Sequence, residues 1–177
     1  MTQHKSRWVI TMGVVGLLVV TTVMAWNQGQ TNMLGWFKKQ VVHLSPPVSG
    51  QILKDGAPVA DVLVTRELTY GNEYLDQART DRDGRFRFPE KRIHSRIPSH
   101  PFDETRLRQV VVADLEDERY LLWYTVTGQT SHHPITLKRK LASLHCDLND
   151  AEQIHNVQIH EHPDFEHVVH SICRWPD

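Results

Sequence analysis

The sequence predicts an all-β domain of roughly seven strands that follows one N-terminal transmembrane helix. The strands are predicted because short runs rich in Val, Ile, Thr, Tyr and Phe recur between turn signals made of Gly, Pro, Asn and Asp. The helix is predicted because an uncharged stretch of membrane-spanning length lies near the N-terminus. No confident long helix follows that stretch, so a β-sandwich is the expected architecture of the remaining chain.

The uncharged stretch runs from Trp8 to Trp26 and would span roughly 28 Å as a helix. Tryptophans at both ends suit the two membrane interfaces, and Lys5 and Arg7 favour a cytoplasmic N-terminus. Two lysines beyond the stretch weaken that preference. We therefore expect a single-pass anchor in the inner (cytoplasmic) membrane, with the rest of the chain in the periplasm.

Two alternatives remain for the N-terminal stretch. Val23-Met24-Ala25 loosely resembles the cleavage site of a signal peptide, although a large residue flanks it. A buried soluble helix is the second alternative, but a helix that is apolar all round needs a large protein to cover it. An anchor and a signal peptide would both export the domain that follows.

The expected organisation has four parts, and the last is long enough for one domain with its own core. These are a cytoplasmic segment, a transmembrane anchor, a juxtamembrane linker and a β-sandwich domain: 1–7, 8–26, 27–47 and 48–177.

The first strands of the domain begin at Val48. Asp55-Gly56 predicts a tight turn after the first of them, because Gly adopts positive φ without steric cost. Apolar residues of the run Val62–Leu68 share one parity, interrupted at Arg66, as in a half-buried strand.

A second turn signal, Asp83-Gly84, predicts a hairpin into another strand. After it, Phe86 and Phe88 alternate with arginines, so one face is apolar and the other is charged. The spacing of Asp81 and Asp83 also matches half of a calcium loop. The positively charged residues that follow lack the further oxygen ligands and the distal Glu of such a loop, so a turn is expected.

This block resembles the transthyretin-like, carboxypeptidase-regulatory-like β-sandwich family over about forty of the 177 residues. The resemblance implies a Greek-key sandwich of seven to eight strands that serves as an accessory or binding module. The chain also resembles small membrane-anchored proteobacterial proteins that carry this domain. The matching residues are Gly50, Asp55, Gly56, Pro58, Val59, Val62, Val64, Thr80, Asp81, Asp83, Gly84, Phe86 and Phe88.

The second half of the domain contains two strong strand patterns and several weaker ones. The strong strands are Gln109–Asp114 and Tyr120–Thr127. A further strand is predicted over Pro134–Leu141, a loop or single helical turn over Leu144–Ala151, and a closing strand pair over Asn156–His160 and Glu166–Arg174.

The chain has two cysteines, Cys146 and Cys173. In an oxidising compartment such a pair predicts a disulfide, which would stabilise the fold by roughly 3–4 kcal/mol. Two separate buried thiols are the alternative.

The segment Lys91–Leu107 interrupts the strand pattern with two prolines and a cluster of basic residues. Long loops of this kind often carry function, and a basic loop with apolar anchors would suit an acidic protein partner or an anionic envelope surface. The alternative is a solvated insertion whose isoleucines pack onto the sandwich. The candidate contact residues are Arg92, Arg96, Ile97, Phe102 and Arg106.

The C-terminal stretch is acidic, in contrast to the basic segment before it, since Asp147–His170 contains six acidic residues, five histidines and no Lys or Arg. His160 and His162 would project from one face of a strand, where they could bind zinc or copper. Solvated surface histidines are the alternative. The histidines also predict a response to mild acid, because the imidazole titrates near pH 6.5.

No recognisable catalytic or nucleotide-binding motif is found, so neither an enzyme nor a cofactor is expected. The net charge of −1 gives no case for nucleic-acid binding. The function we expect is that of a membrane-anchored, extracytoplasmic, non-enzymatic binding module with a protein partner. An immunity-type protein against an envelope-targeting toxin is one such role. The alternative is a periplasmic metal-binding protein that uses the His-rich strands.

Overall fold

The computed structural model describes residues 38–99, 105–128, 133–161, 163–164 and 166–175. The predicted anchor over residues 8–26 lies outside this range, as do Phe102 and His162. Among the described residues, no helix has both the length and the apolar character needed to cross a membrane.

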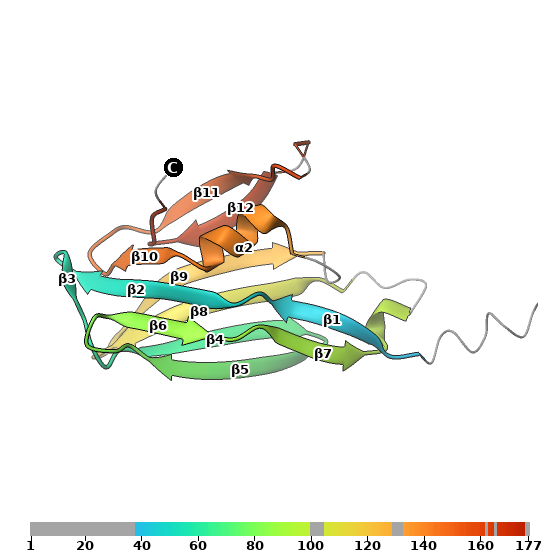
Figure 1. The fold of residues 1–177 in the computed structure, drawn as a ribbon, viewed down its shortest axis with the longest axis horizontal. Helices are drawn as coiled ribbons and strands as arrows, with labels where there is room; N and C mark the ends of the chain where they lie inside the picture. The colour runs from blue at the N-terminus through green and yellow to red at the C-terminus, as the bar shows by residue number, and fades with distance from the viewer. Residues whose placement is uncertain (1–37, 100–104, 129–132, 162, 165, 176–177) are drawn as a thin grey trace, which may run out of the picture.

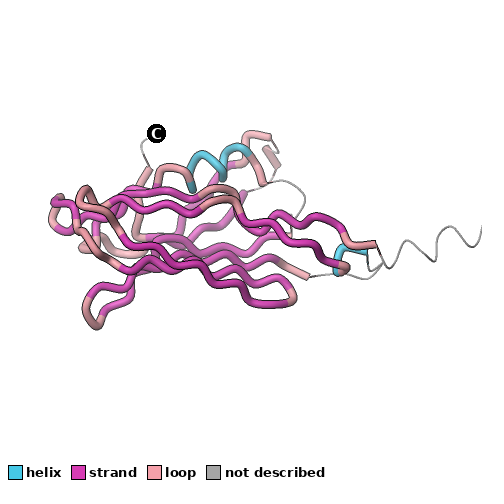
Figure 2. Tube along the Cα trace, turned by 60° about the horizontal axis from the view of Figure 1, so that its bottom comes forward, coloured by secondary structure: helices cyan, strands magenta, loops and turns pink. Residues whose placement is uncertain are grey.

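Strands make up most of the described chain, and helix is confined to two short segments (Figure 2). The strands are β1 (Gln40–Ser45), β2 (Val48–Lys54), β3 (Ala57–Pro58), β4 (Leu63–Tyr70), β5 (Asn72–Arg79), β6 (Arg85–Phe88), β7 (Lys91–Ser95), β8 (Leu107–Leu115), β9 (Glu118–Thr127), β10 (Leu144–Asp147), β11 (Gln153–Gln158) and β12 (Glu166–Ser171). The helical segments are η2 (Ile97–Ser99) and α2 (Ile135–Leu141).

The strands form two layers, which confirms the predicted all-β sandwich (Figure 1). One layer is a six-stranded antiparallel sheet in the order β11-β12-β9-β8-β4-β5. The other contains β10, β2 and β3, with β6 also paired to β2, and it continues into the pair β1–β7. We call this second layer the small layer.

The described residues contain more strands than the seven to eight expected, in part because the small layer is interrupted. β1 pairs antiparallel with β7, and β2 pairs antiparallel with β6. These are two halves of one long strand pair, separated by Pro46-Pro47 on one strand and Pro89 on the other. Proline has no N–H group to contribute to a ladder, so the pairing stops there and resumes beyond it.

The turn at Asp55-Gly56 joins β2 to β3 as the sequence predicts. Both turn residues have positive φ, 53° and 76°, as a two-residue hairpin requires. The Asp147 carboxylate at the end of β10 accepts hydrogen bonds from the backbone N–H groups of Gly56 (2.7 Å) and Asp55 (3.3 Å). The hairpin is therefore tied to the neighbouring strand.

The turn before β6 is as tight as predicted, but it does not close a hairpin. β5 lies in the six-stranded sheet and β6 lies in the small layer, so the turn crosses from one layer to the other. The Asp81 carboxylate accepts hydrogen bonds from the backbone N–H groups of Asp83 (2.9 Å) and Arg85 (2.8 Å). Asp81 thus stabilises the turn, as expected from the argument against a calcium loop.

The main core lies between the two layers. It contains Trp123 on β9, which is fully buried and belongs to one cluster with residues such as Phe88, Ile52 and Val111. A smaller cluster lies under the β1–β7 pair and includes Val42, Leu44, Leu68, Tyr70 and Leu107.

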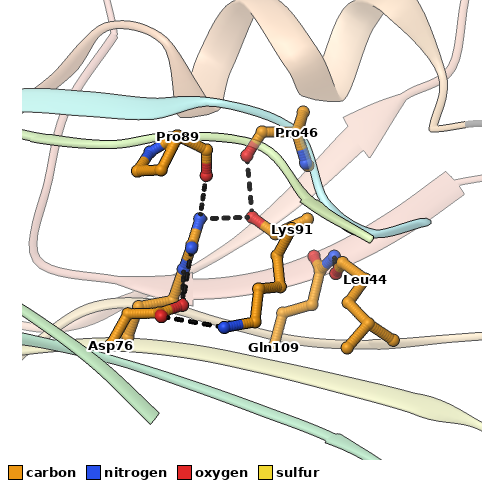
Figure 3. A network of polar contacts seen from close by, with 8 residues as sticks. Leu44, Pro46, Asp76, Pro89, Lys91 and Gln109 are labelled. Carbon is orange, nitrogen blue, oxygen red and sulfur yellow. Dashed lines mark hydrogen bonds and ion pairs between the residues drawn. The ribbon is translucent and has the colours of Figure 1, made fainter. Parts of the chain in front are cut away.

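One charged residue, Arg66 on β4, lies in this interior with 1 % of its surface exposed. Its guanidinium donates to the Asp76 carboxylate (2.6 Å) and to the carbonyl oxygen of Pro89 (2.7 Å). Lys91 donates to the second Asp76 oxygen at 2.9 Å. Figure 3 shows this network between the layers.

The network lies at the interruption of the small layer and explains why a charge is buried there. A broken ladder leaves backbone carbonyls without strand partners, and a buried carbonyl without a hydrogen bond is costly. Arg66 satisfies the carbonyl of Pro89, and the Gln109 side chain donates to the carbonyl of Leu44 at 2.7 Å (Figure 3). The six-stranded sheet therefore completes the hydrogen bonding of the small layer.

The strand predicted over Pro134–Leu141 is wrong, because this segment is the helix α2. Leu137 and Leu141 are four residues apart and are both buried, which is the spacing of one helix face. The Glu161 carboxylate accepts from the backbone N–H of Thr136 (3.2 Å) and from its hydroxyl (2.9 Å), so it caps the helix N-terminus.

The loop or helical turn predicted over Leu144–Ala151 is also wrong at its start, where β10 runs parallel to β2. Leu144 and Cys146 are buried and His145 between them is exposed, but four residues are too few for this alternation to be distinctive. The segment Lys91–Leu107 begins with β7, and β1 lies within the stretch expected to be a linker.

A basic groove as the candidate functional site

A groove of about 980 Å³ lies on the outward face of the small layer. β2 supplies its floor, β6 and the end of β5 supply one wall, and the chain around β10 and the C-terminus supplies the other. The lining residues are Ser49, Gly50, Gln51, Ala78, Arg79, Asp81, Arg85, Phe86, Arg87, Ala142, Ser143, Leu144, His145, Arg174 and Trp175.

Strand register sets the order of side chains across the groove. Gln51 on β2 lies opposite Arg85 on one side and His145 on the other. Ser49 lies opposite Arg87. Because alternate residues of a strand point to one face, these side chains all project outward, and the residues between them point into the core.

Gly50 allows the floor to pack closely. A Cβ atom at this position would lie 2.7 Å from the Cβ and backbone oxygen of Leu144 and 2.9 Å from the ring of Phe86. Any side chain would push β10 or β6 away from β2, so the narrow spacing of the walls depends on this glycine.

The groove is strongly basic, since four arginines and one aspartate line it. The aspartate, Asp81, is occupied by the turn amides described above. Arg79 pairs with the exposed Asp61 at 3.1 Å, Arg174 lies 3.9 Å from the Asp150 carboxylate, and Arg85 reaches Asp83 only at 3.5 Å. Within the described part of the chain, no ion pair or side-chain hydrogen bond engages Arg87. Arg87 therefore adds a positive charge to the groove that no carboxylate in the described part of the chain balances.

The disulfide Cys146–Cys173 holds the far wall and confirms the predicted bond. His145 precedes one cysteine and Arg174 follows the other, and the backbone N–H of Arg174 donates to the carbonyl of His145 at 2.7 Å. The disulfide thus joins the two short segments that carry these groove residues.

Trp175 packs the same wall onto the core. Its ring meets Trp123 edge-on with centroids 5.9 Å apart, and its Nε1 donates to the carbonyl of Lys140 at 2.9 Å. The Lys140 ammonium lies 4.9 Å from the centre of the Trp175 ring. The C-terminal segment is therefore fixed by a covalent bond, a hydrogen bond and ring packing.

The arginines proposed from the sequence as partner contacts lie outside the groove. Arg92 is exposed on β7 and pairs with Glu90, whose pKa the Arg92 guanidinium lowers to about 2, with a smaller contribution from His43. Arg96 is exposed directly after β7, and Arg106 is exposed directly before β8. β7 continues β6 along the small layer (Figure 1). Arg92 is thus a further exposed arginine on the same strand path as Arg85 and Arg87.

Ile97, the apolar residue of that set within the described range, is half-buried and packs against the smaller core cluster. A Cβ atom at Gly71 would lie 2.5 Å from its terminal carbon, so Ile97 packs directly over that glycine. Ile93 packs against the same cluster. The isoleucines of this segment thus pack onto the sandwich, as the alternative interpretation expected.

His160 lies in the turn after β11, so the expected strand does not extend to it. Among the residues that the structure describes, no group of three His, Cys, Asp or Glu side chains is placed to hold a metal ion. Burial lowers the pKa of both His155 and His167, so these histidines stay neutral further into the acid range. These two histidines therefore gain less positive charge in mild acid than the sequence predicts for this region.

Sequence reasoning missed the groove because its residues come from distant parts of the chain. The alternation of Arg85 and Arg87 with phenylalanines was visible, but it indicates only a strand with a charged face. Nothing in the sequence placed His145 and Arg174 beside them, since β10 was not recognised as a strand.

Comparison with known proteins gives one match. A family model described as a domain of unknown function (DUF6795) matches residues 48–151. No match was found among curated proteins or among solved structures. The matched region begins with β2 and ends just after β10, so it includes the floor of the groove and most of both walls. Because the match covers more than half of the chain, this protein belongs to the DUF6795 family.

Proposed function

We propose that this protein is a binding module that holds an acidic protein partner in the basic groove. The observation that carries the proposal is the excess positive charge of a shaped concave surface built on rigid strands. Clustered charge of one sign steers and orients a partner of opposite sign. Arg92, Arg96 and Arg106 would extend the contact beyond the groove, with Ile97 and Phe102 as apolar contacts.

We further propose that the module is displayed outside the cytoplasm by an anchor at residues 8–26. A disulfide in a small domain favours an oxidising compartment, and the periplasm is one. A tethered module with a partner-binding groove suits protection of the envelope, so an immunity-type role against a delivered toxin is the specific function we favour.

The polar groups of the groove favour binding over catalysis. The Ser49 hydroxyl donates to the carbonyl of Ala142 at 2.7 Å, so it is not paired with an imidazole that would activate it. The Gln51 amide donates to the carbonyl of Asp83 at 2.9 Å. Both side chains serve to fix the groove.

The two-layered fold and the turn residues also support a relationship with the transthyretin-like, carboxypeptidase-regulatory-like sandwiches and their Greek-key topology. Thr80 accepts from the N–H of Val62 (2.9 Å) and donates to the carbonyl of Val59 (2.8 Å). Asp81 and Gly84 shape the turn that follows. The shared motif is thus a structural one, compatible with many different partners.

Site-specific photo-cross-linking in the native envelope tests the proposed function. A photoreactive amino acid replaces Gln51 in the groove of the full chain, or Glu73 on the outward face of the other sheet as the control. The proposal predicts a discrete protein adduct from position 51 and none from position 73. Equal adducts from both positions, or an adduct from position 73 alone, would contradict it.

A further inference from the structure

We infer that the groove takes an extended segment of the partner that carries carboxylates at alternate positions. The inference rests on the proposed function, because it specifies the chemistry of the bound partner. It starts from Arg85 and Arg87, which stand two residues apart on the same face of β6.

The spacing of these arginines matches an extended acidic chain. Residues two apart on a strand are separated by roughly 6.5–7 Å, because each residue rises by about 3.3 Å. Carboxylates at positions i and i+2 of an extended partner have the same separation and also project to one side. Each carboxylate can then accept from one guanidinium, which is the donor best matched to it.

The floor and the far wall fit the same occupant. Neighbouring strands are about 4.8 Å apart, so the side chains of β6 and β10 lie on opposite sides of a trough about two strand spacings wide. His145 lies on the side facing the arginines of β6. Arg174 adds positive charge on that side, while its guanidinium donates to the carbonyls of Ile172 (2.7 Å) and Ala151 (3.0 Å). Polar or charged side chains therefore border the space above β2 on both sides.

An acidic protein segment fits the groove better than a nucleic acid. Single-stranded nucleic acids bind by stacking their bases on exposed aromatic rings as well as by phosphate contacts. Three rings line the groove: Phe86 is buried, Trp175 is packed against Trp123, and the imidazole of His145 is exposed. The groove thus offers more charge than stacking surface.

Two peptides of equal composition provide the test. The first, Thr-Thr-Glu-Thr-Glu-Thr-Thr, places its carboxylates at i and i+2, and the second, Thr-Thr-Glu-Glu-Thr-Thr-Thr, places them at i and i+1. Each carries a fluorescent label and is titrated by anisotropy against the full chain in detergent at low salt. We expect the alternating peptide to bind about fivefold more tightly, as one additional exposed charge pair provides.

Variants assign that preference to the groove. Arg87→Gln should abolish the difference between the peptides, whereas Arg82→Gln, at an exposed arginine outside the groove, should preserve it. Thermal melting of both variants verifies that they are folded. Equal binding of the two peptides, no binding of either, or a preference that survives Arg87→Gln would overturn the inference.

A thymidine oligonucleotide serves as competitor for the alternative class of ligand. Displacement of the alternating peptide by a lower concentration of the oligonucleotide than of unlabelled peptide would overturn the inference in favour of a nucleic acid. The outcome is separable from that of the proposed function. An adduct from position 51 without a peptide preference would support the binding module and reject the alternating carboxylates. A peptide preference without an adduct would support the alternating carboxylates and reject a protein partner at position 51 in the envelope.

Discussion

Arg66 supplies a hydrogen bond to a backbone carbonyl that has no strand partner. It interrupts an apolar strand pattern at a position that faces the core, and the structure pairs it with Asp76 and with the carbonyl of Pro89. Burial raises the pKa of Asp76, but the hydrogen bonds from Arg66 and Lys91 outweigh this effect and hold that pKa below its usual range. The Asp76 carboxylate is therefore ionised at neutral pH.

Replacement of Arg66 by alanine should lower the free energy of unfolding by about 3 kcal/mol, because it leaves Asp76 with one partner and the Pro89 carbonyl with none. Arg87→Ala on the neighbouring layer is the matched control, and it should change stability by less than about 0.5 kcal/mol. Urea denaturation of both variants measures the effect. Equal stability of the two variants would show that the network contributes nothing.

His133 is a second residue with a measurable consequence. It precedes α2, it is buried, and its Nε2 finds no hydrogen-bond partner in the described structure. Burial is the main cause that lowers its pKa to about 4, from an ordinary value of 6.5. The folded protein therefore binds a proton at His133 more weakly than the unfolded chain does.

Stability should consequently decline as the pH falls from about 6.5 to 4, by at most about 3 kcal/mol for this group, and should be fully retained above pH 6.5. His133→Gln should flatten the dependence of unfolding free energy on pH across that window. His94→Gln, which removes an exposed histidine on β7, serves as the control. An unchanged slope in His133→Gln would exclude this residue as the source.

At the scale of elements, turns and caps decide where strands begin and end. Gly84 has a φ of 71°, and a Cβ there would lie 2.4 Å from the carbonyl oxygen of Ile52 on β2. Gly56 has a similar φ of 76°, but nothing lies within 4 Å of the corresponding position. A side chain at Gly56 would thus introduce backbone strain alone, whereas a side chain at Gly84 would add a steric contact.

Gly56→Ala should cost about 1 kcal/mol, since an L-residue is strained in the left-handed region. Gly84→Ala should cost at least about 1 kcal/mol more, because β2 must also move away from the turn. Thermal and urea unfolding of the two single variants provide the comparison. A smaller loss in Gly84→Ala than in Gly56→Ala would contradict the predicted contact.

The elements that the sequence predicts well are those in which local pattern and tertiary role coincide. β8 and β9 are rich in β-branched and aromatic residues, and the Asp55-Gly56 turn forms as expected. β5 was missed because it is an edge strand with mostly exposed polar residues, so its sequence has no apolar alternation. α2 was mistaken for a strand because its apolar spacing extends over only two turns.

The groove could not be predicted from the sequence for a different reason. Its charged residues were all visible in the sequence, but their assembly depends on the parallel pairing of β10 with β2 and on the position of the C-terminus. Those pairings join residues nearly a hundred positions apart, such as Gln51 and His145. Local propensity carries no information about such contacts, whereas the even number of cysteines did indicate that two of these segments meet.

At the scale of the whole molecule, the disulfide connects stability, compartment and the shape of the groove. Cys173→Ser should lower the free energy of unfolding by about 2–4 kcal/mol and weaken the groove wall that carries Arg174. The full chain isolated without reductant should show no reactive thiol after unfolding. Two titratable thiols would show that the protein resides where the bond does not form.

The central claim is that the basic groove holds an acidic partner in the native envelope. The most direct test repeats the cross-linking from position 51 in a chain that also carries Arg85→Glu and Arg87→Glu, with Arg82→Glu as the control for charge. Reversal of two groove charges should repel the partner and abolish the adduct, whereas the control should retain it. An adduct of unchanged yield in the reversed groove would contradict the account.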